Sequence, residues 1–328
     1  MVLEKEERAR MKDARILLFC VSVLFVLLFP IALSADSSAL ILSSVPGDEE
    51  HAEKFSKWTE TTRKILVDKF GFAADRVIVL ANKKTAKAEI QKSFAQLKTQ
   101  LKPTDTFFLF FIGHGSYDTD YKFNILGPDF TGAEYAQLIS TLPAVRTVIV
   151  NGTSASGGSV ETLAGKNRVI ITATKSGREA NETVFYEYFL KGLEEASADE
   201  DKDKKVSVWE AFKFATESVD RFYKEQGRMA TEHPQLAANG AEVVDLKVKD
   251  APALARLTTF QVDRPITVAD PALQALLNEK NAIDQKIEAL RINKGNIPEA
   301  EYEKQLDELL VQLATKNQQI KDQEKKKP

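Results

Sequence analysis

The sequence of 328 residues predicts an α/β protein in which a mostly parallel sheet lies between two layers of helices, followed by a C-terminal α-helical hairpin. Three observations predict this fold. Apolar runs of strand length, such as Phe107–Ile112, alternate with helical segments from residue 38 to about residue 248. These runs are continuously apolar, which is typical of parallel strands covered by helices on both faces. Beyond residue 271 the apolar residues recur every three or four positions, which predicts the hairpin. The sequence therefore indicates a three-layer α/β/α sandwich.

Each expected strand is a short apolar run bounded by polar or turn-forming residues. The third run is the most apolar, and a turn at Pro103, Thr104 and Asp105 leads into it. We expect strands at Ala39–Val45, Arg76–Leu80, Phe107–Ile112, Thr147–Val150, Val169–Thr174 and Val243–Val248.

The expected helices place apolar residues on one face. In the first helix Phe55 and Trp58 stand three positions apart, and in the second Ile90, Phe94 and Leu97 recur at helical spacing. We expect helices at Glu50–Phe70, Thr85–Leu101, Thr131–Thr141, Thr183–Leu193 and Ser207–Gln226.

The C-terminal part, residues 272–324, contains two apolar seams separated by Gly295 and Pro298, which end one helix and start the next. A proline-containing linker, residues 249–271, separates it from the α/β domain, residues 36–248. The hairpin either folds back on the main domain or serves as a coiled-coil arm for self-association or partner binding. The seam positions are Leu273, Leu276, Ile283, Ile287 and Leu290, then Tyr302, Leu306, Leu309, Leu313 and Ile320, with Lys280 and Lys316 as the polar interruptions.

The first 35 residues read as a secretory signal peptide, because basic residues precede the apolar run Ile16–Phe29 and small residues follow at Ala32–Ala35. We therefore expect export to the periplasm or the exterior, with an uncleaved membrane anchor as the alternative. Cys20, the only cysteine, lies inside this run, so the mature chain would have no thiol. The net charge of −3 gives no basic field of the kind that binds nucleic acid.

Two small-residue motifs follow neighbouring strands. His114 stands between Gly113 and Gly115 after the third strand, and Ser154 lies in the turn Asn151–Gly158 after the fourth. Chemistry in parallel sheets collects at the carboxyl ends of the strands, where both motifs fall. A histidine can accept the proton of a nucleophile there, and Gly152, Ser156 and Gly157 would expose that nucleophile and offer amide groups to an oxyanion.

These motifs resemble the caspase–legumain–metacaspase group of peptidases, over roughly residues 39–248. That group carries His-Gly after one strand and Asp-x-Cys-x-Ser-Gly after the next. Aligned on Ser156 and Gly157, Ser154 stands at the nucleophile position and Gly152 at the acidic position. The segments at residues 184–190 and 207–212 look like the legumain-type branch.

The resemblance implies a peptidase fold whose cysteine is absent. We expect a catalytically inactive homologue that binds a peptide or a protein. The alternative is an active peptidase or amidase with Ser154 as nucleophile and His114 as general base, oriented by Asp118 or Asp120. A second alternative is a structural scaffold that works through the hairpin. His51 and His233 show no metal-ligand spacing with His114, so we expect no zinc site.

An acidic segment, residues 199–210, matches the ligand spacing of an EF-hand loop. The ligands would be Asp199, Asp201, Asp203, Ser207 and Glu210. Lys204 stands where such loops carry glycine and would need a positive φ, and neighbouring lysines offset the negative charge. We therefore expect a solvated loop that caps the next helix and no bound cofactor, with Ca²⁺ binding as the alternative.

Overall fold

The computed structural model describes residues 36–143, 146–244, 246, 251–262, 268 and 270–325. The expected signal peptide, residues 1–35, and Cys20 lie outside these residues. Within the described part of the chain, no helix has the length and apolar character needed to cross a membrane.

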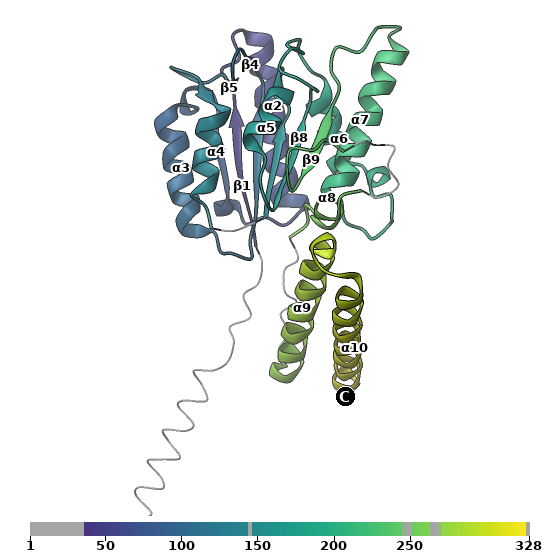
Figure 1. The fold of residues 1–328 in the computed structure, drawn as a ribbon. Coiled ribbons are helices and arrows are strands. Elements are labelled where there is room, and N and C mark those ends of the chain that lie inside the picture. Colours follow the sequence, from purple (N-terminus) through teal and green to yellow (C-terminus); the bar gives the residue numbers. More distant parts are fainter. Residues whose placement is uncertain are drawn as a thin grey trace, which may run out of the picture. The chain divides into compact units, whose positions relative to one another are not determined.

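The central sheet has six strands in the order β2-β1-β3-β7-β8-β9 (Figure 1). Five are parallel, and β9 runs antiparallel to β8. At the centre of the sheet Leu109 of β3 pairs with Leu40 of β1 and with Ile149 of β7. The strands are β1 Ser37–Ser43, β2 Val77–Leu80, β3 Thr106–Ile112, β7 Arg146–Asn151, β8 Arg168–Thr172 and β9 Gln235–Ala238.

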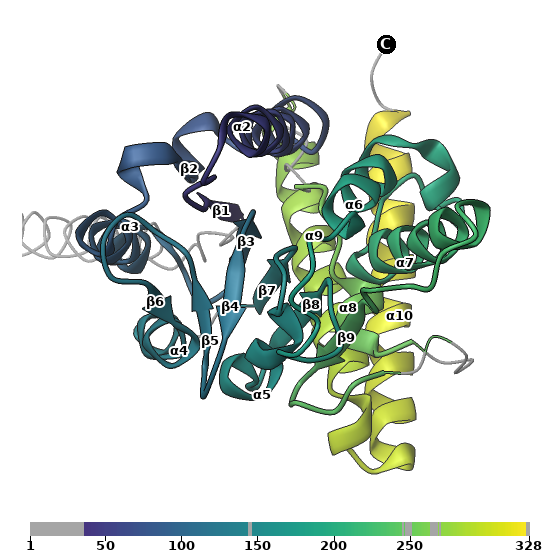
Figure 2. The same cartoon turned by 90° about the horizontal axis from the view of Figure 1, so that it is seen from above.

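Both faces of this sheet are covered by helices, which confirms the predicted three-layer α/β/α fold (Figure 2). One face packs against α2 Glu49–Lys64, α6 Phe185–Glu194 and α7 Val208–Glu225. The other packs against α3 Lys87–Gln100, α4 Gly132–Ser140 and the short α5 Val160–Leu163. Along β3, Phe108 and Phe110 enter the first core while Phe107, Leu109 and Phe111 enter the second, which is the alternation of a strand buried on both sides.

Short elements that the sequence did not predict surround the main ones. A small antiparallel sheet, β4 Gly115–Tyr117, β5 Tyr121–Phe123 and β6 Phe130–Thr131, is inserted between β3 and α4. Its strands are too short to show an alternating pattern. A π-helical turn, Ile65–Lys69, extends α2, and 3₁₀ turns occur at Ala74–Arg76, Asn82–Lys84, Ser156–Ser159 and Ala196–Ala198.

The last strand of the sheet is β9, and the expected strand Val243–Val248 was misplaced. Its first two residues fold back on β9, with the Val244 amide donating to the Leu236 carbonyl oxygen at 2.8 Å, after a turn at Asn239. Residues 245 and 247–248 lie outside the described part. The run Gln235–Ala238 gave no strand pattern because alanine and glutamine have low β propensity.

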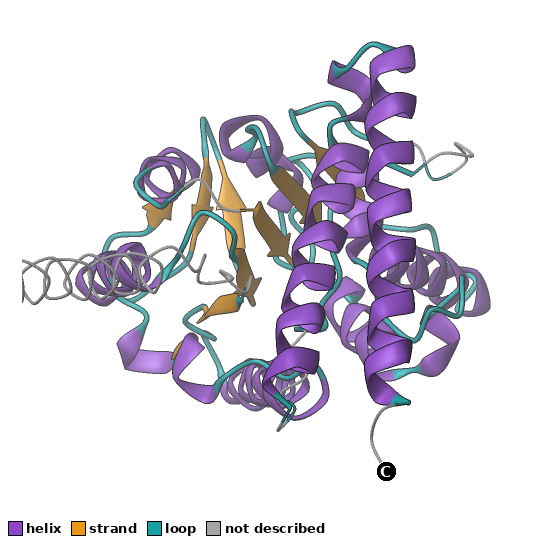
Figure 3. Cartoon of the chain, turned by 90° about the horizontal axis from the view of Figure 1, so that it is seen from below, coloured by secondary structure: helices purple, strands orange, loops and turns teal. Residues whose placement is uncertain are grey.

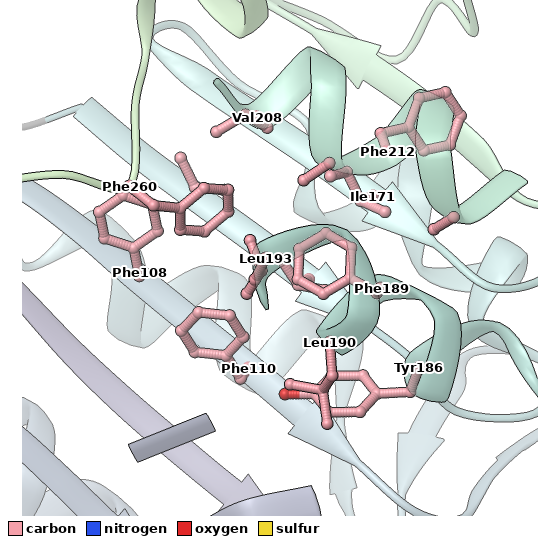
Figure 4. Close-up of a cluster of buried hydrophobic side chains, with 14 of the residues drawn as sticks. Phe108, Phe110, Ile171, Tyr186, Phe189, Leu190, Leu193, Val208, Phe212 and Phe260 are labelled. Carbon is pink, nitrogen blue, oxygen red and sulfur yellow. The ribbon is translucent and has the colours of Figure 1, made fainter. Parts of the chain in front are cut away.

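The segment expected to be a linker, residues 249–271, contributes to the core instead of merely connecting two parts. It contains α8 Ala253–Leu257, and Phe260 after it is fully buried. The centroid of the Phe260 ring lies 5.1 Å from that of Phe108 (Figure 4). It lies 5.7 Å from the centroid of the Phe70 ring. This part of the chain therefore completes the apolar layer over β3.

The C-terminal hairpin is formed by α9 Pro271–Ile292 and α10 Glu299–Glu324, joined by a 3₁₀ turn at Lys294–Asn296 (Figure 3). Both lysines that interrupt the seams are paired. Lys316 contacts Glu279 on the facing helix, and Lys280 lies 2.6 Å from Asp284. Glu288 of α9 also pairs with Arg146 at the start of β7, with 2.8 Å between Oε1 and Nη1.

Phe260→Ala tests whether the expected linker is part of the core. Loss of this buried ring is expected to lower the free energy of unfolding by about 3–5 kcal/mol, because its removal leaves a cavity beside Phe108 and Phe70. Urea denaturation measures the change. Met229→Ala is the control, since Met229 is 89% exposed and its removal should change stability by less than about 0.5 kcal/mol. Equal stability of the two variants would contradict this assignment.

Candidate active site

His114 is held directly after β3 by the backbone on both sides of it. Gly113 has φ +112°, and a Cβ on it would lie 2.1 Å from Ser44 Oγ, so only glycine fits this turn. The His114 amide donates to the same Ser44 oxygen at 2.8 Å. These contacts turn the imidazole toward α2, where its ring centroid lies 4.9 Å from that of Phe55.

The protonation state of His114 follows from its partners. Its Nε2 lies 3.0 Å from the Pro46 carbonyl oxygen. A carbonyl oxygen can only accept, so Nε2 carries the proton and Nδ1 holds the lone pair. Burial lowers the pKa of His114 below its ordinary value, and this outweighs the opposite effect of the Pro46 hydrogen bond. The imidazole is therefore a neutral potential base at pH 7.

Asp118 and Asp120, expected as orienting groups, serve other contacts. Asp118 lies 2.6 Å from Lys122, and this hydrogen bond holds the pKa of its carboxyl well below the usual range. Asp120 accepts from the amides of Tyr121 at 2.8 Å and Ala133 at 3.1 Å, and so positions the start of α4. The orienting group of His114 is the Pro46 carbonyl, which no sequence motif marks, because any residue provides a carbonyl.

Ser154 lines the same hollow as His114, but its hydroxyl is hydrogen-bonded to Gly115. Its hydroxyl donates to the Gly115 carbonyl oxygen at 3.0 Å, and the Gly115 amide lies 3.4 Å from the same Oγ. The residue is 7% exposed. Among the described residues, no hydrogen bond joins Ser154 to His114. The two predicted catalytic side chains are thus brought together without the contact that would activate the hydroxyl.

The loop after β8 closes over the turn that carries Ser154. The Ala155 amide donates to the Glu179 carbonyl oxygen at 2.8 Å. The Glu179 carboxylate in turn accepts from the Lys175 amide at 2.9 Å and lies 2.5 Å from His233 Nδ1. His233 is therefore attached to this loop through Glu179.

The remaining predicted site residues fall into two groups. Gly113 lines the same small hollow as His114 and Ser154, together with Phe55, Trp58, Glu182 and Thr183. Ser156 and Gly157, expected near an oxyanion, instead fix the neighbouring loop. Ser156 Oγ accepts from the Ala173 amide at 3.1 Å, and the Gly157 amide donates to Thr174 Oγ1 at 2.9 Å.

Gly152, at the position where the resembling peptidases carry an acidic residue, has no room for a side chain. A Cβ there would lie 2.3 Å from the ring of Tyr186. The Gly152 carbonyl accepts from Thr183 Oγ1 at 2.8 Å. Tyr186 is fully buried and donates or accepts a hydrogen bond with Thr62 at 2.9 Å, so it cannot move aside easily. The Tyr186 ring therefore fills the space that a side chain at position 152 would need.

Sequence reasoning missed four residues that surround His114. The His51 ring lies 4.7 Å from that of His114, between centroids, and His51 Nδ1 lies 2.7 Å from Asp48. Glu182 lies 3.6 Å from His51 Nε2 and also pairs with Lys54. The only sequence signal was the position of Asp48 just before a helix, where an aspartate caps the first turn.

The acidic loop brings three of its five predicted ligands together. Carboxylate oxygens of Asp199, Asp201 and Asp203 lie within 4.8 Å of one another. Lys204 has φ +70°, as the glycine position of such a loop requires. Ser207 and Glu210 instead form a reciprocal cap at the start of α7, with the Glu210 amide donating to Ser207 Oγ at 3.2 Å.

Known proteins resemble this chain at the level of solved structures and at low sequence identity. No protein-family model and no curated protein matches it. The chain is similar to the protein GSU0716 from Geobacter sulfurreducens, at 16% identity and a TM-score of 0.48, over 70% of this chain and 100% of that one. It is also similar to caspase-1 from Spodoptera frugiperda, at 14% identity and a TM-score of 0.41, over 64% of this chain and 89% of that one. The assignment of the fold rests on the chain's own sheet order and layers.

Gly152→Ala measures how closely Tyr186 packs on the turn. The added methyl group is expected to lower the free energy of unfolding by about 1–3 kcal/mol, because it overlaps a buried ring. Thermal or urea unfolding gives the value. The matched control is Gly240→Ala, where nothing lies within 4 Å of the new Cβ. A change at Gly152 no larger than the control would show that the turn can relax.

Calcium tests the acidic loop. At about 1 mM, where extracellular modules bind this ion, calcium is expected to leave the unfolding temperature unchanged, because Ser207 and Glu210 cap α7 and nearby lysines offset the charge. Differential scanning calorimetry with calcium and with a chelator measures the difference. A rise in unfolding temperature with calcium would contradict this expectation if Asp201→Asn abolishes the rise. The control is Asp220→Asn, on the exposed side of α7, which should leave such a rise unchanged.

Proposed function

We propose that this protein is an exported caspase/legumain-like peptidase homologue that has lost hydrolytic activity and binds a peptide or protein beside Ser154. The observation that carries the proposal is the hydrogen bond from the Ser154 hydroxyl to the Gly115 carbonyl oxygen at 3.0 Å. The order of the His114 and Ser154 motifs on neighbouring strands supports the family, and the pattern of residues 1–35 supports export.

The chemistry of the nucleophile supports the loss of activity. A thiol has a pKa of about 8.5 and supplies some thiolate at neutral pH, whereas a hydroxyl needs a base to remove its proton during attack. A base must reach that proton within about 2.6–3.2 Å. The basic lone pair of His114 is on Nδ1, and no hydrogen bond among the described residues joins this ring to Ser154. The Ser154 proton is directed at Gly115 instead. A hydroxyl in this arrangement stays unactivated.

The surroundings of Ser154 support binding. The hollow beside it has an aromatic wall, Phe55 and Trp58, and a polar rim that includes Glu182 and Thr183. The hollow has room for about one water molecule, so a peptide would bind across its rim and not inside it. The parallel strands end here, where open α/β sheets bind their ligands.

Two alternatives each have one supporting observation. A neutral His114, with Nε2 fixed by Pro46 and a lone pair on Nδ1, favours an active Ser154 hydrolase. Exposed Leu310 and Val311, adjacent on α10, favour a scaffold that self-associates or binds a partner through the hairpin.

Hydrolysis of a diverse fluorogenic peptide library separates these functions. The wild-type protein and Ser154→Ala are expected to cleave no peptide. Ser154→Cys is expected to cleave, because a thiol needs less activation than a hydroxyl. Thermal unfolding of each variant controls for folding. Cleavage by the wild type that disappears in Ser154→Ala would overturn the inactive assignment and support the hydrolase. If neither the wild type nor either variant cleaves any peptide, the result would favour the scaffold that functions through the hairpin.

A further inference from the structure

We propose that the exported chain begins at Asp36, and that the α-ammonium group formed there supplies a positive charge to a buried cluster at the start of β1. The inference rests on the export part of the proposed function and goes beyond it, since it names the peptide bond that is cut and the group that receives the new terminus. It follows from the contacts among Asp36, Arg76 and Asp105.

Asp105, in the turn before β3, is the centre of this cluster. Its side chain is fully buried. One carboxylate oxygen, Oδ1, accepts from the backbone nitrogen of Asp36 at 3.1 Å. The other, Oδ2, accepts from Arg76 Nη1 and from the backbone amide of Lys102, each at 3.1 Å, while the Lys102 side chain is exposed. A carboxylate that is buried in this way needs both donors and a positively charged partner.

The charges of the cluster do not balance. Asp36 and Asp105 each carry one negative charge, and both pair with Arg76, whose Nε lies 3.0 Å from the Asp36 carboxylate. Within the described part of the chain, no second cation pairs with either carboxylate. Arg146, on the adjoining strand β7, is paired with Glu288 instead. Two negative charges and one positive charge therefore leave a net negative charge beside a fully buried group.

Cleavage directly before Asp36 balances these charges. Ala35, a small residue of the kind found at signal-peptide cleavage sites, precedes Asp36 and lies outside the described residues. Hydrolysis adds the hydroxyl of water to the Ala35 carbonyl carbon, and the Asp36 nitrogen takes the hydrogen and then a proton from solvent. The nitrogen beside Asp105 thus changes from a neutral amide into an ammonium group with three N–H donors. Its hydrogen bond to Asp105 then joins two ions, which makes it roughly twice as strong.

The competing cut lies one residue earlier. Ala32 and Ser34 also have the small side chains of a cleavage site, and cleavage after Ser34 leaves Ala35 as the first residue. The positive charge is then carried by Ala35, and the Asp36 nitrogen remains a neutral amide. The two cuts therefore differ in whether the ammonium group faces Asp105.

The start of the processed chain is the first test. The full precursor is produced with its own leader in a Gram-negative host, and the intact mass and N-terminal sequence of the periplasmic protein are measured. A start at Asp36 is expected. A start at any other position after the leader would overturn the inference and leave export standing. A protein that keeps the leader would overturn both the inference and the export part of the proposed function.

Unfolding of the processed chain tests the ion pair itself. At about pH 7 the chain that begins at Asp36 is expected to have an unfolding constant about tenfold smaller than a chain that begins at Ala35, because only the first holds its ammonium group on Asp105. Urea denaturation gives both constants. Asp105→Asn should remove the difference, and Asp75→Asn, at an exposed residue next to Arg76, should retain it. Equal constants, or a difference that survives Asp105→Asn, would overturn the inference and leave the proposed function standing.

The pH dependence of this difference needs no substitution, so it decides the matter even if Asp105→Asn does not fold. In the folded chain the two carboxylates raise the pKa of the ammonium group above its unfolded value of about 7.7–8.0, against the smaller opposing effect of Arg76. The added stability is therefore complete below about pH 7.7 and is lost as the pH rises through the folded-state pKa. A difference between the two chains that stays constant from about pH 7 to about pH 11 would contradict the inference.

Discussion

The burial of β3 on both faces is the constraint on which the rest of the domain depends. Every side chain from Phe107 to Ile112 is fully buried. An apolar strand at the centre of a parallel sheet must be covered twice, so helices are required on each side. The coverage is completed by a residue distant in sequence, Phe260, which packs on Phe108. The strand also fixes the site, because His114 follows it and the turn that carries Ser154 follows its neighbour β7.

Two backbone carbonyl groups determine the chemistry of that site. The Pro46 carbonyl fixes the tautomer of His114, and the Gly115 carbonyl accepts the Ser154 hydroxyl. The first bond holds the proton on Nε2 and leaves the basic lone pair on Nδ1, and the second engages the Ser154 proton. The base and the hydroxyl lie close in the fold, yet each has its own partner.

The surface around His114 is built from α2 and the loop after β8. Asp48, His51 and Lys54 come from the first turns of α2, and Glu182 comes from the loop. Lys54 pairs with Glu182, and His51 Nδ1 lies 2.7 Å from Asp48.

The sequence by itself determined the layers of the fold, the helical hairpin and the adjacency of His114 and Ser154. Apolar periodicity and strand-end position are local properties, and the carboxyl ends of neighbouring parallel strands must meet at one edge of the sheet. Only the tertiary structure decided which group orients His114, that Ser156 and Gly157 serve the neighbouring loop, that Tyr186 fills the space at Gly152, and that Phe260 belongs to the core. These outcomes depend on contacts between residues far apart in the chain. Local pattern carries no information on such contacts, because a carbonyl group or an aromatic ring can meet many partners and packing selects one.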